Sequence, residues 1–121
     1  MVRLGIDLAG KDSAVLSTCN RIYRGLCALE IYRGAPDQLS TDRVKEKIDN
    51  YQHHFEEGAT GSRSSIAQRN MARKEVIELF KKIIRFLEII ATEADIPDLI
   101  QAGFTVRKSF ARKRTGVVQP A

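Results

Sequence analysis

Apolar residues recur with helical spacing in four separate segments of the chain. In the first segment, steps of four and three residues connect Val15, Cys19, Ile22, Leu26 and Leu29. This spacing predicts an amphipathic helix. Asp12 or Ser13 is expected to cap its start, and residues 34–38, which include Pro36, are expected to end it.

A second helix is predicted by a narrower stripe that begins at Val44. The stripe comprises Val44, Ile48, Tyr51 and Phe55, and Ser40 or Thr41 is expected to cap the helix. Residues 58–62 then form a short turn rich in glycine. Because short connections favour antiparallel neighbours, we expect the second and third helices to form a hairpin.

The third helix, predicted over residues 62–91, carries the strongest periodicity in the sequence. Two adjacent stripes run along it, one formed by Ile77, Phe80, Ile84, Leu87 and Ala91, and the other by Val76, Leu79, Ile83, Phe86 and Ile90. Together they cover nearly half of the helix circumference. One partner helix cannot bury so wide a face, and we therefore expect this helix to occupy the interior of a bundle.

A short fourth helix and two extended arms complete the predicted elements. Pro97 suits the first turn of the fourth helix and Gly103 its end. Val2 to Leu8 and Phe104 to Val106 alternate apolar with other residues, which predicts extended structure at both ends of the chain. Pairing of these arms with each other, or with the arms of a second copy, would satisfy their backbones.

The predicted fold class is therefore all-α. We expect an up-down helical bundle of three long helices plus a short fourth, with short extended N- and C-terminal arms. Residues 1–108 are predicted to form a single helical-bundle domain, and residues 109–121 a basic, mobile tail.

Composition places the chain among ordinary globular proteins, with 43% hydrophobic and 29% charged residues. The net charge of +5 arises after Gln101, where five basic residues and no acidic residue occur, namely Arg107, Lys108, Arg112, Lys113 and Arg114. This tail is a candidate contact for nucleic acid or an acidic surface. Only Phe110 lies between its cations, which gives little support for base stacking.

The two cysteines, Cys19 and Cys27, are predicted to lie about 12 Å apart along one helix, beyond the reach of a disulfide. They are interpreted as small apolar side chains in a reducing compartment. No signal-peptide pattern and no long apolar run occurs, and we therefore expect a cytoplasmic protein without membrane contact.

One candidate site lies at the start of the third helix, where its apolar stripes continue into Arg69, Asn70 and Arg73. The predicted hairpin brings His54 of the second helix near them. The structural interpretation pairs the arginines with Glu56, Glu57 or helix-terminal carbonyls. The functional interpretation is an anion or RNA-backbone site.

The sequence contains no recognisable catalytic, cofactor or metal signature. Arg69-Asn70 resembles part of the Arg-Asn-x-x-x-His motif of helical ribonucleases, but Lys74 occupies the histidine position. His53 and His54 are neighbours and point about 100° apart on a helix, which does not suit chelation of one metal. We therefore expect a protein that is not an enzyme and that uses no cofactor.

Residues 68–73, Gln-Arg-Asn-Met-Ala-Arg, and 101–108, Gln-Ala-Gly-Phe-Thr-Val-Arg-Lys, flank the long apolar helix. This pattern resembles small, uncharacterised bacterial helical proteins with an Ala-Arg-Asn-x-x-Arg helix and a Ser-Gly-Phe-x-x-Arg-Lys segment. In that group the segment often precedes a fibronectin type III domain. Ala102 stands at the serine position here. The resemblance implies a helical interaction or scaffold module and implies no activity.

Two functions remain open from the sequence. The first is a non-enzymatic helical module that forms a homo-oligomer or binds a protein partner. The alternative is a nucleic-acid-binding accessory protein that uses Arg69, Arg73 and the basic tail.

Overall fold

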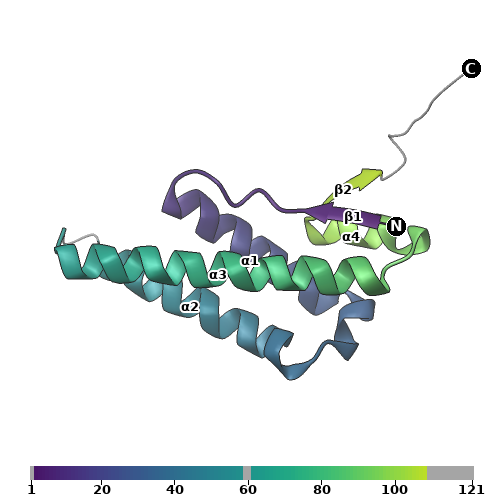
Figure 1. Cartoon of the computed structure of the whole chain (residues 1–121), viewed down its shortest axis with the longest axis horizontal. Coiled ribbons are helices and arrows are strands. Elements are labelled where there is room, and N and C mark those ends of the chain that lie inside the picture. Colours follow the sequence, from purple (N-terminus) through teal and green to yellow (C-terminus); the bar gives the residue numbers. More distant parts are fainter. Residues whose placement is uncertain (1, 59–60, 109–121) are drawn as a thin grey trace, which may run out of the picture.

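The chain folds as an all-α bundle with a small sheet (Figure 1). This computed structural model describes residues 2–58 and 61–108, and the predicted tail at residues 109–121 lies outside the described residues. The elements are β1 (Val2–Gly5), α1 (Asp12–Ala28), α2 (Thr41–Gly58), α3 (Arg63–Ile90), α4 (Ile96–Ala102) and β2 (Thr105–Lys108). Short 3₁₀ helices occupy Glu30–Gly34, Asp37–Leu39 and Glu93–Asp95.

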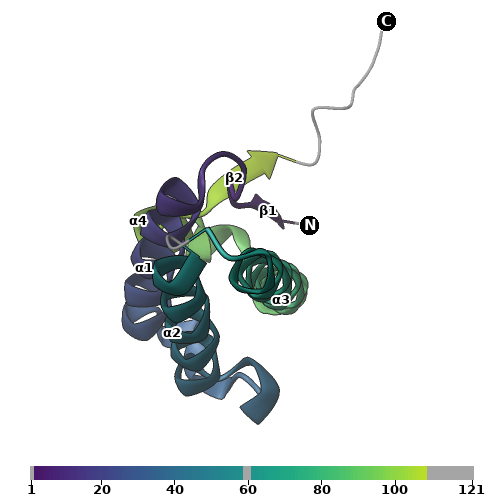
Figure 2. The same cartoon turned by 90° about the vertical axis from the view of Figure 1, so that its left-hand side faces the viewer.

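The predicted hairpin of the second and third helices is confirmed. The helices α2 and α3 run side by side in opposite directions and make the most extensive contact in the molecule (Figure 1). Viewed end-on, α1 and α2 lie together, α3 lies to one side, and the strands lie above (Figure 2). Up-down connectivity therefore holds for the three long helices.

The expectation that α3 would occupy the interior of the bundle is wrong, because one face of this helix is exposed. Its buried residues are Ala72, Val76, Phe80, Ile83 and Leu87. They follow a line between the two predicted stripes, whose other members are half-buried or exposed. The contacts of α3 with α2, β1 and the 3₁₀ helix at Asp37–Leu39 are on the side of this line, and the opposite face remains exposed, with Ile89 there 76% accessible.

Capping groups define the starts of α2 and α3 where the sequence predicts them. The Ser40 hydroxyl accepts a hydrogen bond from the backbone N–H of Arg43, and the Ser62 hydroxyl accepts one from that of Ser65. Gly103 ends α4 in the left-handed conformation with φ of 112°, as expected for a glycine stop. These local signals were sufficient to place the three boundaries.

The first helix differs from its prediction at both ends. Its N-cap is Lys11, without a side-chain capping bond, and the helix ends at Ala28 instead of near Gly34. The chain continues in a 3₁₀ turn, which places Leu29 and Tyr32 on one buried side because this helix has three residues per turn. The Tyr32 ring packs edge-to-face against Phe86 of α3.

The two arms pair with each other within the chain. The strands β1 and β2 are antiparallel, with Val2 opposite Lys108 and Gly5 opposite Thr105. The backbone N–H of Leu4 donates to the Glu88 carboxylate of α3 at 2.9 Å. The sheet is thus bonded to the end of the long helix.

The helices α1 and α4 cross at a distance that only glycine permits. A Cβ atom at Gly25 would lie 2.2 Å from the carbonyl oxygen of Ala102 and 2.6 Å from its Cα atom. Both obstructing atoms belong to the backbone, which cannot turn aside as a side chain would. Gly25 therefore sets the separation of these two helices.

We expect Gly25→Ala to lower the free energy of unfolding by about 1–3 kcal/mol, because the added methyl group forces the helices apart. Urea denaturation followed by circular dichroism measures this change. Gly34→Ala is the matched control, since a Cβ atom there meets nothing within 4 Å. Equal stability of the two variants would contradict the steric role of Gly25.

Candidate functional site

The polar cluster that the structure forms near the start of α3 is centred on Asp12, the first residue of α1. The Asp12 cluster consists of Asp12, Tyr51 of α2, and Arg69 and Arg73 of α3. It lies beside the apolar core, because Tyr51 is fully buried and the side chains of Asp12, Arg69 and Arg73 are 15%, 25% and 27% exposed. The cluster thus connects the three long helices.

Three groups converge on the Asp12 carboxylate. The Tyr51 hydroxyl donates to Oδ1 at 2.5 Å, and a guanidinium N–H of Arg73 donates to the same oxygen at 3.0 Å. The Nε atom of Arg69 lies 3.2 Å from Oδ2, an ion-pair contact that lacks the alignment of a hydrogen bond. Both carboxylate oxygens are therefore engaged.

Electrostatics keep this carboxylate ionised. Partial burial alone would raise the pKa of Asp12. The hydrogen bonds from Tyr51 and Arg73 and the charges of both arginines outweigh that effect, and the pKa lies below its ordinary value. Burial and the adjacent carboxylate raise the pKa of Tyr51, which therefore stays protonated and remains a donor.

The structure brings together only part of the predicted site. Arg69 and Arg73 do continue the core-facing side of α3, whereas Asn70 is exposed and His54 borders a separate small hollow with Gln68. The carboxylate that both arginines share is Asp12 and not one of the predicted glutamates. The Asp12 side chain turns toward α2 and α3 instead of capping its own helix.

Sequence reasoning missed Asp12 and Tyr51 as members of this cluster. Asp12 is of a residue type that commonly caps helices, and Tyr51 fits the apolar stripe of α2. Neither residue carries a local signal for the other, since they are 39 positions apart. Only the packing of three helices places them together.

The predicted tail contacts lie only partly within the described residues. Arg107 and Lys108 belong to β2, while Arg112, Lys113 and Arg114 lie outside the described residues.

Within residues 2–58 and 61–108, no group of three or more His, Cys, Asp or Glu side chains is arranged to hold a metal ion. In the same residues, no helix is long and apolar enough to cross a membrane.

The two cysteines are free thiols in different environments. Cys19 lies in the core, and burial raises its pKa to about 12, whereas Cys27 is exposed near the end of α1. The apolar interpretation therefore fits Cys19 and not Cys27.

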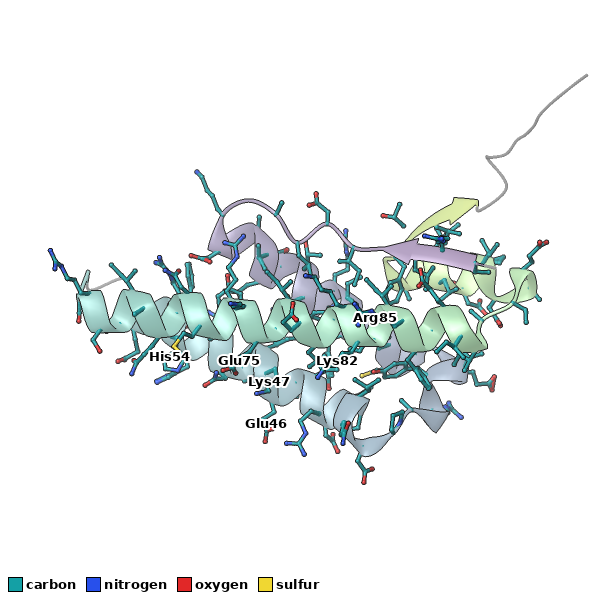
Figure 3. The ribbon with its side chains drawn as sticks, viewed as in Figure 1. Glu46, Lys47, His54, Glu75, Lys82 and Arg85 are labelled. Atoms are coloured by element: carbon teal, nitrogen blue, oxygen red, sulfur yellow. The ribbon has the colours of Figure 1, made fainter. Side chains whose placement is uncertain are left out.

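Two concave surfaces lie away from the Asp12 cluster. One, between α1 and α4, is bordered by Arg21, Arg24, Arg33, Glu30 and Asp98 among others. It lies at the C-terminal ends of two helices, whose carbonyl groups favour cations over anions. The other runs between α2 and α3, where Lys47 and Glu75 pair across it at 3.1 Å (Figure 3).

In comparisons with known proteins, the chain matches no family model, no curated protein and no solved structure.

We expect Asp12→Asn to lower the free energy of unfolding by about 1–3 kcal/mol at neutral pH, because two partly buried arginines lose their counter-ion. Chemical denaturation measures the loss. Asp49→Asn is a matched control in an exposed pair with Lys45, where we expect a change below about 0.5 kcal/mol.

The stability conferred by Asp12 should also depend on pH. Because its pKa is lower in the folded chain, the unfolded chain takes up this proton first as pH falls below about 4. Stability should therefore decrease with falling pH in that range, and less steeply in Asp12→Asn than in the unchanged protein. Parallel pH profiles for the two proteins would contradict the depressed pKa.

Alkylation should distinguish the two thiols. At mildly alkaline pH we expect iodoacetamide to modify Cys27 in the folded protein and both cysteines in denaturant, because Cys19 is inaccessible and protonated. Mass spectrometry of the intact chain counts the modifications. Rapid labelling of Cys19 in folded Cys27→Ser would show that the core opens readily.

Proposed function

We propose that the chain is a non-enzymatic helical interaction or scaffold module that binds another protein or a second copy of itself. The observation that carries this proposal is a pair of exposed apolar side chains on one side of α3. Met71 is 64% and Ile89 76% accessible, at positions that lie on the same side of the helix. Contact of these two side chains with a partner would remove apolar area from water.

Charged residues lie between these two positions on the same face of α3. Glu75, Glu78, Lys82 and Arg85 follow one another along it, and Figure 3 shows Glu75, Lys82 and Arg85 in sequence along α3. Taken as a whole, an interface that forms and dissociates is about as polar as the rest of a protein surface. This composition supports an interaction module over a permanently buried interface.

The arrangement of the arms and arginines bears on which partner is favoured. Since β1 and β2 satisfy each other's backbone within one chain, exchange of arms with a second copy is unnecessary. Arg69 and Arg73 already share Asp12, which leaves less of their charge for a phosphate. These contacts support a protein partner over the alternative of nucleic-acid binding.

Sedimentation equilibrium tests the part of the proposal that concerns a second copy. We expect the apparent mass to rise above 13.6 kDa only at high concentration, as weak association through the α3 face would produce. Ile89→Lys should abolish this rise, because it places a charge in the contact. Glu93→Lys is a control at an exposed position outside α3.

A strictly monomeric chain at every concentration would eliminate self-association and leave a different protein as the partner. Association that Ile89→Lys does not weaken would show that the α3 face is not the contact.

A further inference from the structure

We infer that the concave surface between α2 and α3 is a docking site for an acidic amphipathic helix of a partner protein, an inference that rests on the proposed interaction function. The α2/α3 groove is bordered by Gln38, Arg43, Lys47, Met71, Lys74, Glu75, Glu78, Leu79 and Lys82, and its volume is 590 Å³. Residues 71–82 extend about 16 Å along α3, or about three helical turns. This length suits a short helical segment.

Two of the side chains that line the groove, Leu79 and Met71, are apolar. The half-buried Leu79 packs against the core, and the exposed Met71 stands at the end nearer the start of α3. Methionine adapts its shape to different partners because its side chain is unbranched and flexible. These two side chains offer a surface for the apolar face of a docked helix.

The charged side chains that line the groove are predominantly positive, four being basic and two acidic. Several are already paired, because Lys47 contacts Glu75, Glu78 contacts Lys81, and Arg43 contacts Glu46. Figure 3 shows Lys47 and Glu75 facing each other from α2 and α3. Both carboxylates of the groove are thus neutralised within the protein.

Two lysines of the groove remain without a counter-ion. Lys74 and Lys82 have no ion-pair or hydrogen-bond partner among residues 2–58 and 61–108. They lie about 12 Å apart along α3, a separation of about two turns. Carboxylates spaced two turns apart on a partner helix would match them, and contact with Leu79 and Met71 favours a helix with one apolar face.

The groove also continues beyond the paired residues. Met71 and Glu75 border a second, smaller hollow that includes His54 and Gln68, and Figure 3 places His54 farther along the same side of α3. A docked helix therefore has room to extend toward the start of α3.

The test uses the full chain and two fluorescent synthetic peptides, measured by anisotropy. One peptide forms an amphipathic helix with leucines on one face and glutamates on the other, and the second has lysine at every glutamate position. We expect saturable binding of the acidic peptide only, weakening as salt is raised.

Two pairs of variants locate the binding. We expect Lys74→Glu with Lys82→Glu to weaken binding at least about tenfold, and Lys45→Glu with Arg63→Glu, the same change in charge outside the groove, to change it less than about twofold. Met71→Gln should weaken binding severalfold, whereas Ile100→Gln, at an exposed apolar position of α4, should not. Circular dichroism confirms that each variant is folded.

Absence of saturable binding, equal binding of the basic peptide, or equal weakening by the control pair would overturn the inference. Tighter binding of a single-stranded oligonucleotide to the same lysines would assign the groove to a phosphate backbone and would also overturn it. If no peptide bound while the unchanged chain still self-associated, only the groove would be refuted. Absence of both kinds of binding would count against the proposed function itself.

Discussion

The packing of α2 along α3 is the contact on which the remaining structure depends. Val44, Ile48 and Tyr51 of α2 enter the same core as the buried line of α3, and burial of each such side chain contributes about 1.5–3 kcal/mol. This contact aligns the two helices over most of their length. It creates the α2/α3 groove on one side, and it presents Tyr51 and the two arginines to α1 on the other.

The Asp12 cluster shows how a bundle accommodates charge beside its core. An arginine removed from water requires a carboxylate, and one carboxylate here serves two arginines and a tyrosine. Such an arrangement adds specificity to packing that apolar contacts leave less defined, because only one relative position of three helices satisfies it. In this cluster the arginines therefore contribute to the structure of the bundle.

The sequence contained enough information for elements whose signals are local. Helical spacing located α3, and the caps at Ser40, Ser62 and Gly103 set boundaries to within a residue. The sequence places the end of α1 too late, because Leu29 continues the apolar stripe of the helix. At that point the backbone changes to a 3₁₀ turn, which buries Tyr32. The sequence wrongly predicts that α3 lies in the interior of the bundle. Periodicity gives the width of an apolar face, but it does not show how much of that face neighbouring elements cover.

For the candidate site, the sequence identified two arginines but not their partners. Arg69 and Arg73 were conspicuous because they interrupt an apolar stripe. Asp12 was not, since an aspartate at a helix start has an ordinary local explanation, and its actual contacts depend on tertiary packing. The α2/α3 groove could not be predicted from the sequence either. Its edges come from two helices, and the sequence does not define how each helix is rotated about its own axis.

The pairing of β1 with β2 has a consequence for how this bundle can be combined with other polypeptides. Val2 and Lys108 are opposite each other, so the two ends of the described part of the chain lie side by side. A unit with this geometry can be placed within a surface loop of a host protein without separating the two ends of that loop. The strand pair then acts as a stem, and the helices project from it as a single appendage.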